Sequence, residues 1–379
     1  MVTGRFTNAV VFDGDVLHRP ATLVVEDGRV SAIEPGVASG GVDCEGLLLA
    51  PGFIDLQVNG GADLLFGVEP TGDALRLIAT AHEALGTTHL LPTVISGTPE
   101  ELRAGRDAVA GVISGDEAEG AVLGIHYEGP TISSQRLGAH PAGRQCDLPI
   151  DDDRLWRLPE GAVVRATLAP EVTRRGDIGR LAAMGVLVAV GHTDATVEET
   201  RAAIAEGANC ATHLFNAMPP VRARQPGAAG AFLDSDDAWV SVIADGVHVD
   251  AALLRIATRA KPPGKLFAVS DAMPPVGGSS DHFQLGDSLV TVVGDRCVLD
   301  DGRLAGAAEP LAAAVRVLVT SVGLVLEEAL RMVSRYPAEY AGLGGRLGRL
   351  APGYEATATI LDDELTVRGV IRRGRLRWC

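Results

Sequence analysis

Residues 186–192 read VLVAVGH, an almost unbroken apolar run that ends on a histidine, and a stretch with helical periodicity, VEETRAAIAEG, follows at 197–207. A short apolar run followed by a helix is typical of a strand buried on both faces of a parallel sheet. The chain contains eight such runs: GFIDLQV (52–58), THLLPTVI (88–95), AVLGIHY (121–127), VVRATLA (163–169), VLVAVGH (186–192), CATHLF (210–215), WVSVIAD (239–245) and KLFAVSD (265–271). Eight such units, most of them separated by helices, predict an α/β fold of the TIM (β/α)8 barrel type, and a doubly wound open sheet is the alternative.

Helix candidates between these runs include residues 73–86, 177–185, 197–207 and 251–260. The position of the polar residues favours the barrel over the open sheet. Side chains capable of chemistry follow the C-terminal ends of the predicted strands, where the active sites of such barrels lie.

The two ends of the chain have a different pattern, with short alternating segments and turn signals, as in TLVVEDGRVSAIEPG (22–36) and RGVIRRGRLRW (368–378). Such segments are typical of hairpins. We therefore expect a small β-sandwich domain formed by residues 1–50 and 344–379, beside a barrel domain of residues 51–343. Residues 274–304 are expected to be an insertion after the eighth strand, with a Gly-rich loop leading into a hairpin.

Composition excludes several classes of protein. The 379 residues carry a formal net charge of −16, which argues against nucleic acid or an anionic membrane surface as a partner. No apolar run approaches the ~20 residues of a membrane span, and the chain does not open with the pattern of a signal peptide. The five cysteines show no C-x-x-C spacing, so a cytoplasmic protein is expected.

Three potential metal ligands each end a predicted strand: Glu128 in IHYEGP, His192 in VGHTDAT and His213 in THLFNAM. A glutamate with two histidines is a known catalytic zinc set that leaves a position open for water. Any one of them alone is more simply a hydrogen-bonded polar residue. All three at one rim of a barrel predict a site for one divalent transition metal, with zinc first and Fe(II) or Mn as alternatives.

Asp271 follows the apolar run LFAV, so its carboxylate is expected at the barrel mouth beside the metal. There it can act as the general base and then as the general acid. The alternative is that Asp271 caps a following turn.

Gln57 and Asn59 stand where many metal-dependent relatives of such barrels carry H-x-H. Neutral amides are poor ligands for a transition metal, so one tight metal is expected and a second site is absent or weak. Both amides can equally hydrogen-bond to loop backbone.

Seven segments then occur in an order that resembles the N-acetylglucosamine-6-phosphate deacetylases of the amidohydrolase superfamily. They are PGFIDLQVNGG (51–61), HYEGP (126–130), LAPE (168–171), GHTDAT (191–196), THLFNAM (212–218), ADGVHVD (244–250) and VSDAMPP (269–275). The resemblance implies a metal on Glu128, His192 and His213, with Asp271 as proton donor and acceptor.

The same resemblance implies substrate contacts and a partner. His140 matches the position beside the reacting carbonyl and is expected to help stabilise the oxyanion. The other implied substrate contacts are Ala139, Asn216, Ala217, Arg224, Asp245, His248, Leu304, Ala305 and Gly306, with Arg224 as a partner of the phosphate. A homodimer is implied, because in this family a neighbouring subunit often completes the phosphate site.

Three departures bear on the substrate: the loop TISSQRLGAHPAG (131–143), Gln225 in place of a glutamate, and GAAEPLAAA (306–314) in place of a segment rich in Ser and Thr. The resemblance implies a hydrolase that converts N-acetylglucosamine 6-phosphate into glucosamine 6-phosphate and acetate. A related N-acetyl amino sugar phosphate or another small amide is the alternative substrate, and a non-catalytic relative is the rival of another class. The phosphorylated amino sugar is the expected small-molecule partner.

Overall fold

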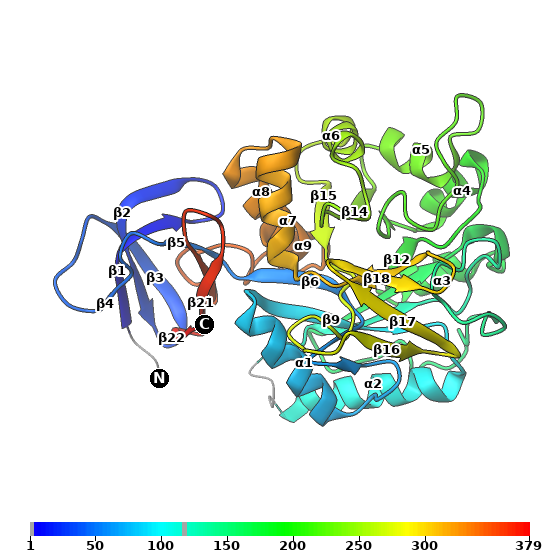
Figure 1. Cartoon of the computed structure of the whole chain (residues 1–379), viewed down its shortest axis with the longest axis horizontal. Coiled ribbons are helices and arrows are strands. Elements are labelled where there is room, and N and C mark those ends of the chain that lie inside the picture. The colour runs from blue at the N-terminus through cyan, green and yellow to red at the C-terminus, as the bar shows by residue number, and fades with distance from the viewer. Residues whose placement is uncertain (1–3, 116–119) are drawn as a thin grey trace.

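Eight parallel strands form the centre of the computed structural model, which describes residues 4–115 and 120–379 (Figure 1). Neighbouring strands pair in the order β15-β14-β13-β12-β11-β10-β9-β6. Their bounds are β6 Phe53–Val58, β9 Thr87–Ile95, β10 Gly124–Glu128, β11 Val163–Leu168, β12 Leu187–Val190, β13 Cys210–Ala211, β14 Trp239–Ile243 and β15 Leu266–Val269. Each overlaps one of the eight apolar runs, so the predicted barrel is confirmed.

The first and last strands meet just beyond the end of β15. The amide of Asp271 donates to the carbonyl of Gln57 over 3.1 Å, and that of Asn59 donates to the carbonyl of Ala272 over 2.9 Å. These bonds continue the parallel pairing across the seam, with Val58 opposite Ala272. Closure of the barrel therefore sets Asp271 beside Gln57, although the two residues are far apart in the sequence.

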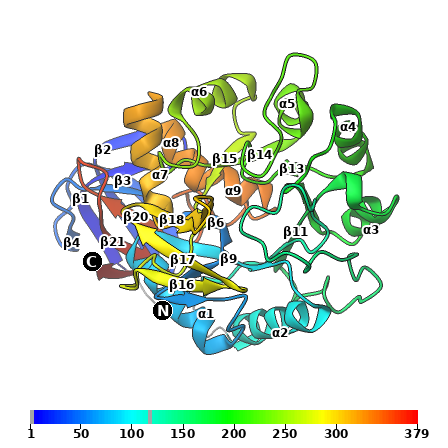
Figure 2. The same ribbon diagram turned by 45° about the vertical axis from the view of Figure 1, so that its right-hand side comes forward.

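The helices cover the outside of the barrel, as Figure 2 shows for α2 to α6. Local sequence fixes several of their starts: α4 begins after Thr196, whose hydroxyl and the side chain of Glu199 form a capping box, and α6 begins after the N-cap Asp250. The helices are α1 Gly72–Ala84, α2 Pro99–Gly115, α3 Asp177–Ala183, α4 Val197–Glu206, α5 Gly227–Asp234, α6 Ala251–Ala260, α7 Leu311–Val317, α8 Leu326–Val333 and α9 Arg335–Tyr340, with a 3₁₀ turn at Pro170–Val172 and a π-helical turn at Leu318–Val322. Across the described ranges, none of the helices has the length and apolar character to cross a bilayer.

Both ends of the chain build a second sheet beside the barrel (Figure 1). Its order is β22-β21-β20-β5-β1-β2-β3, with β4 on β1, and it encloses an apolar core of its own that includes Phe6, Leu23 and Ile360. Its strands are β1 Gly4–Phe12, β2 Leu17–Glu26, β3 Arg29–Pro35, β4 Val42–Asp43, β5 Leu48–Pro51, β20 Ala358–Leu361, β21 Val367–Arg372 and β22 Arg375–Trp378. The expectation that the two termini share one β domain is confirmed. We infer the division into residues 1–50 with 344–379 and residues 51–343 from this sheet membership.

A buried ion pair joins this domain to the barrel. Arg372 on β21 approaches Glu83 of α1, with its Nε 2.8 Å from the carboxylate Oε2, and also donates to the carbonyl of Thr88. Arg377 binds the other oxygen of Glu83 over 2.7 Å. Because Arg372 and Glu83 are both buried, removing either partner of this pair would be destabilising.

Two small sheets stand at the C-terminal rim of the barrel. One is the hairpin of β7 (Gly60–Gly61) and β8 (Leu64–Leu65). The other lies within and just beyond the expected insertion and has four antiparallel strands, β16 His282–Leu285, β17 Ser288–Val293, β18 Arg296–Leu299 and β19 Leu304–Ala307. Its own apolar cluster, which includes Met273 and Leu285, packs against Leu65, Ile95 and Ala139 from the barrel rim.

Strand β10 can lie against β11 only because residue 124 is glycine. A Cβ at Gly124, where φ is +156°, would stand 1.8 Å from the carbonyl oxygen of Val163. We expect Gly124→Ala to lower the free energy of unfolding by about 1–3 kcal/mol, the usual cost of overpacking a core. Thermal or urea unfolding measures the change. Gly111→Ala, on the exposed face of α2 with open space around it, is the matched control and should not destabilise; equal stability of both variants would contradict the prediction.

Candidate active site

Four side chains at the C-terminal ends of barrel strands meet at the mouth of the barrel. Glu128 is the last residue of β10, while His192, His213 and Asp271 each stand two residues beyond β12, β13 and β15. The last three have left-handed backbones, with φ of 49°, 32° and 58°. Such strained conformations of residues other than glycine cluster at functional sites, because the surrounding fold must hold them in place.

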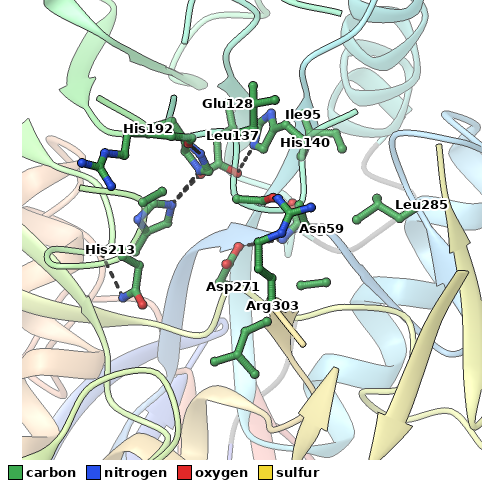
Figure 3. A pocket seen from close by; sticks show the side chains of 18 of the residues that line it. Asn59, Ile95, Glu128, Leu137, His140, His192, His213, Asp271, Leu285 and Arg303 are labelled. Carbon is green, nitrogen blue, oxygen red and sulfur yellow. Dashed lines mark hydrogen bonds and ion pairs between the residues drawn. The ribbon is translucent and has the colours of Figure 1, made fainter. Parts of the chain in front are cut away.

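The side chains of Glu128, His192 and His213 point at one another (Figure 3). The Nε2 atom of His213 lies 2.9 Å from Oε1 of Glu128 and 3.1 Å from Nε2 of His192, and Nε2 of His192 lies 3.3 Å from the same carboxylate oxygen. All three residues are buried. Two imidazole nitrogens and one carboxylate oxygen therefore converge within a single coordination distance of a common point.

The protonation of His192 fits a metal at that point. Its Nδ1 lies 2.9 Å from the carbonyl oxygen of Arg136, which can only accept, so Nδ1 carries the hydrogen and Nε2 presents its lone pair to Glu128 and His213. Metal-binding histidines are usually oriented by such a backbone carbonyl. The residues present thus match the donor set of a divalent transition metal.

His140 is a fourth group at this centre, and its hydrogen bonds distinguish it from the other histidines. Glu128, His140 and His192 have ligand atoms within 4.8 Å of one another, and Nε2 of His140 lies 3.7 Å from Oε2 of Glu128. However, Nδ1 of His140 accepts from the backbone amide of Ser96 over 3.3 Å, and the Ser96 hydroxyl lies 2.8 Å from it. An accepting Nδ1 requires the hydrogen on Nε2, so His140 is a donor toward the pocket and His213 is the better third ligand.

The two amides of the first strand bind carboxylates. Gln57 donates through Nε2 to Oε1 of Glu128 over 2.9 Å and to Oδ1 of Asp271 over 3.0 Å, and Asn59 donates to the same Oδ1 over 2.7 Å. The alternative that both amides bind loop backbone is therefore wrong. The turn after Asp271 is bridged by Ser270, whose hydroxyl accepts from the amide of Ala272, so Asp271 does not serve as the cap of that turn.

Burial and neighbouring charges shift the pKa values at this centre in opposite directions. Burial raises the pKa of Asp271, and the nearby Glu128 carboxylate raises it further. Although burial opposes it, the three surrounding histidines, His140, His192 and His213, hold the pKa of Glu128 well below its usual range. Burial, with the charge of His192, lowers the pKa of His140 to about 4, which agrees with a neutral imidazole at that position.

These residues line a cavity of about 470 Å³. It brings together most of the side chains that sequence reasoning assigned to the substrate, namely Ala139, His140, Asn216, Ala217, His248, Leu304, Ala305 and Gly306. Asp245 stands behind His248, with its carboxylate 2.6 Å from Nδ1 of that histidine. Burial disfavours the charged forms of both residues. The contact between them outweighs this effect, so the pKa of His248 is raised and that of Asp245 is lowered.

Arg224 does not line this cavity and is exposed on the loop that precedes α5. The arginines that do line it are Arg136, paired with Asp194 over 2.6 Å, and Arg303, which bonds to the carbonyl of Gly138 across the pocket mouth (Figure 3). Sequence reasoning missed both of them. Arg136 lies in the loop 131–143, and Arg303 directly precedes Leu304. Closeness in sequence to these predicted substrate contacts was the only feature that could have pointed to the two arginines.

The sequence matches the amidohydrolase family over residues 48–377. The chain belongs to this family. Within it, the chain is 38% identical to an N-acetylgalactosamine-6-phosphate deacetylase of a Shewanella species, over 86% of this chain and 82% of that protein. It is 36% identical to the human N-acetylglucosamine-6-phosphate deacetylase, over 99% of this chain and 95% of the relative.

Solved structures agree with these relatives. The N-acetylglucosamine-6-phosphate deacetylase of Pasteurella multocida superimposes with a TM-score of 0.94 at 31% identity, covering 100% of both chains. A mutant of the Mycobacterium smegmatis enzyme, in complex with N-acetyl-D-glucosamine-6-phosphate, gives a TM-score of 0.90 at 34% identity and covers 99% of both chains. The resemblance found in the sequence motifs is confirmed.

We expect the amidohydrolase to hold about one tightly bound transition metal per chain, because the neutral amides of Gln57 and Asn59 are poor ligands and already donate to carboxylates. Elemental analysis of the purified protein measures the content. His192→Ala and His213→Ala should each lose the metal, whereas His282→Ala, whose side chain is 64% exposed on β16, should keep it. Two tightly held metals per chain, one of them on Gln57 or Asn59, would contradict this expectation.

Proposed function

We propose that this protein removes the acetyl group of an N-acetylhexosamine 6-phosphate, with N-acetylglucosamine 6-phosphate as the first candidate, to give the free amine and acetate. The observation that carries the proposal is the convergence of Glu128, His192 and His213 beside Asp271. Deacetylases with this substrate in their names are similar to the chain over nearly its whole length. The match across the full fold makes the same reaction the simplest use of the site.

Glu128, His192 and His213 would hold one divalent transition metal, with zinc the first choice and Fe(II) or Mn the alternatives. Bound there, the metal would polarise the acetamide carbonyl and lower the pKa of water. The remaining chemistry falls to side chains of the protein.

Asp271 accepts a proton from the attacking water and then donates it to the nitrogen of the leaving amine. Gln57 and Asn59 both bind Oδ1, so Oδ2 is the oxygen available for this transfer. Burial raises the pKa of Asp271, which favours retention of the proton until the C–N bond breaks. His140, with its hydrogen on Nε2, donates to the negative charge that develops on the carbonyl oxygen.

The proposal includes a cytoplasmic location and a homodimer. Five free cysteines support a reducing cytoplasm. A homodimer would explain why Arg224 lies outside the cavity of its own chain, since the loop of one subunit could then reach the phosphate bound by the other.

N-acetylgalactosamine 6-phosphate is the second candidate substrate. A relative that is 38% identical to the chain over 82% of its own length carries that sugar in its name. The segment GAAEPLAAA (306–314), which lacks the hydroxyl groups expected there, begins at Gly306 in the cavity wall. Acetate release from the two 6-phosphates, each compared with its unphosphorylated sugar, decides between the epimers. Equal turnover of sugars with and without phosphate would count against both.

Asp271→Asn tests the proton transfer. The substitution preserves the shape of the side chain but removes its basic site, so kcat should fall by roughly 10²- to 10⁴-fold. Metal content should hardly change, while His192→Ala should lose metal and activity together. Both quantities are measured on the same preparations. Near-normal turnover of Asp271→Asn, or loss of metal from this variant, would contradict the proposed role of Asp271 in proton transfer.

Arg224→Ala tests the phosphate contact. We expect KM for the phosphorylated substrate to rise with little change in kcat, because the phosphate is remote from the reacting bond. Arg222→Ala, exposed on the same loop, is the matched control. Light scattering measures whether the protein is a dimer. A rise in KM for Arg303→Ala but not for Arg224→Ala would assign the phosphate to the cavity of the same chain.

A further inference from the structure

A second, smaller cavity of about 80 Å³ adjoins the main one. The two share Asn59, Leu65, Ile95 and Leu285. The smaller cavity also borders Ser96, whose hydroxyl and amide hold His140 in place. The proposed reaction as described does not use this space.

Polar and apolar groups lie on opposite sides of the main cavity. Figure 3 shows Ile95, His140 and Leu285 on the side away from His213. The polar side includes Asn216, whose side chain donates to the carbonyl of His213 over 3.2 Å, and Arg136, whose carbonyl accepts from His192. The proposed substrate is an amide with a sugar on its nitrogen and an alkyl group on its carbonyl carbon, and it matches the two sides of the cavity in only one orientation. The sugar takes the polar side and the alkyl group faces Ile95 and Leu285.

The side cavity begins at this apolar side and has a mixed lining, in which Thr93, Ser96, Glu101 and Arg144 stand beside apolar residues. Beyond Leu65 and Ile95 its walls include Gly67 and Val68, and neither of these two residues lines the main cavity. A Cβ built on Gly67 would approach only the backbone nitrogen of Ile95, at 4.0 Å, so there is open space at this point. This space offers room for the end of an alkyl chain longer than a methyl group, which would pass Leu65, Ile95 and Leu285 on its way from the main cavity.

We infer that the acyl subsite accepts chains longer than acetyl, so that the protein also hydrolyses N-propionyl and N-butyryl derivatives of the same amino sugar phosphate. This inference rests on the proposed function. The reaction is an ordinary hydrolysis: the C–N bond breaks, water supplies the new oxygen of the carboxylic acid, and its protons pass to the acid and the amine. Asp271 transfers the proton as it does for the acetyl substrate.

The charged and exposed part of the side-cavity lining sets an upper limit to the chain. Arg144 and Glu101 form an ion pair in that lining, with 2.8 Å between Nη1 and Oε2, and Val68 is 69% exposed. A long alkyl chain would meet these charges and water. Hexanoyl and longer groups should accordingly be poor substrates.

The first experiment compares kcat/KM for the N-acetyl, N-propionyl, N-butyryl and N-hexanoyl derivatives of glucosamine 6-phosphate. A pocket without space discriminates against one extra methylene by roughly 10- to 200-fold. We expect the propionyl and butyryl compounds to stay within about tenfold of the acetyl compound, and the hexanoyl compound to fall below them. If the acetyl compound is hydrolysed but kcat/KM for the propionyl and butyryl compounds is more than about 100-fold lower, the inference is overturned and the proposed function still stands. Absence of acetyl hydrolysis would overturn both.

The second experiment fills the side cavity with Gly67→Val. Its kcat/KM for the butyryl compound should fall at least about tenfold, while acetyl turnover stays within about twofold, which also shows that the variant is folded. Gly111→Val, in open space on α2, is the matched control and should change neither value. Equal losses for the acetyl and butyryl compounds in Gly67→Val, or no loss for either, would overturn the assignment of this cavity to the acyl chain.

Discussion

The amide group of Gln57 stands between two carboxylates, the buried Glu128 and the half-buried Asp271, and the site depends on this arrangement. Glu128 ends the third barrel strand and Asp271 follows the eighth, and in a water-poor interior their charges repel each other strongly. One N–H₂ group donates to both, over 2.9 and 3.0 Å, so each carboxylate gains a partner without a second cation. Because Gln57 belongs to β6 and Asp271 follows β15, the same contact lies at the seam that closes the barrel.

A second polar layer supports the site from below, inside the barrel. The guanidinium of Arg165 is fully buried and donates to the carbonyl of Leu56 over 3.1 Å and to the hydroxyl of Thr212 over 3.0 Å. The hydroxyl of Ser241 accepts from the backbone amide of His213 over 3.0 Å. Buried polar groups destabilise the fold when they lack hydrogen-bond partners, whereas a fully bonded network holds its side chains in one geometry. The left-handed backbone of His213 is thus fixed by neighbours on three strands.

The insertion completes the cavity that the barrel opens. Its four-stranded sheet has its own apolar cluster, and Leu285 and Met273 from that cluster form part of the cavity wall. Arg303 at the start of β19 bonds back to Gly138 on the loop after β10, which joins the two edges of the pocket mouth. Part of the apolar cavity wall, through Met273 and Leu285, and a cation at the entrance, Arg303, therefore come from one segment that follows the last barrel strand.

The amino-acid sequence by itself determined the barrel, the grouping of four candidate site residues at one rim and the shared terminal sheet. Buried parallel strands have near-continuous apolar sequences, and the C-terminal ends of such strands meet at one rim, so Glu128, His192, His213 and Asp271 could be grouped without coordinates. Only the tertiary structure decided the partners of these groups. Ser96 orients His140, Gln57 bridges two carboxylates, and Arg303 enters the cavity while Arg224 stays outside it. These outcomes depend on atoms brought within hydrogen-bonding distance by segments far apart in the chain, and neither apolar periodicity nor motif spacing contains that information.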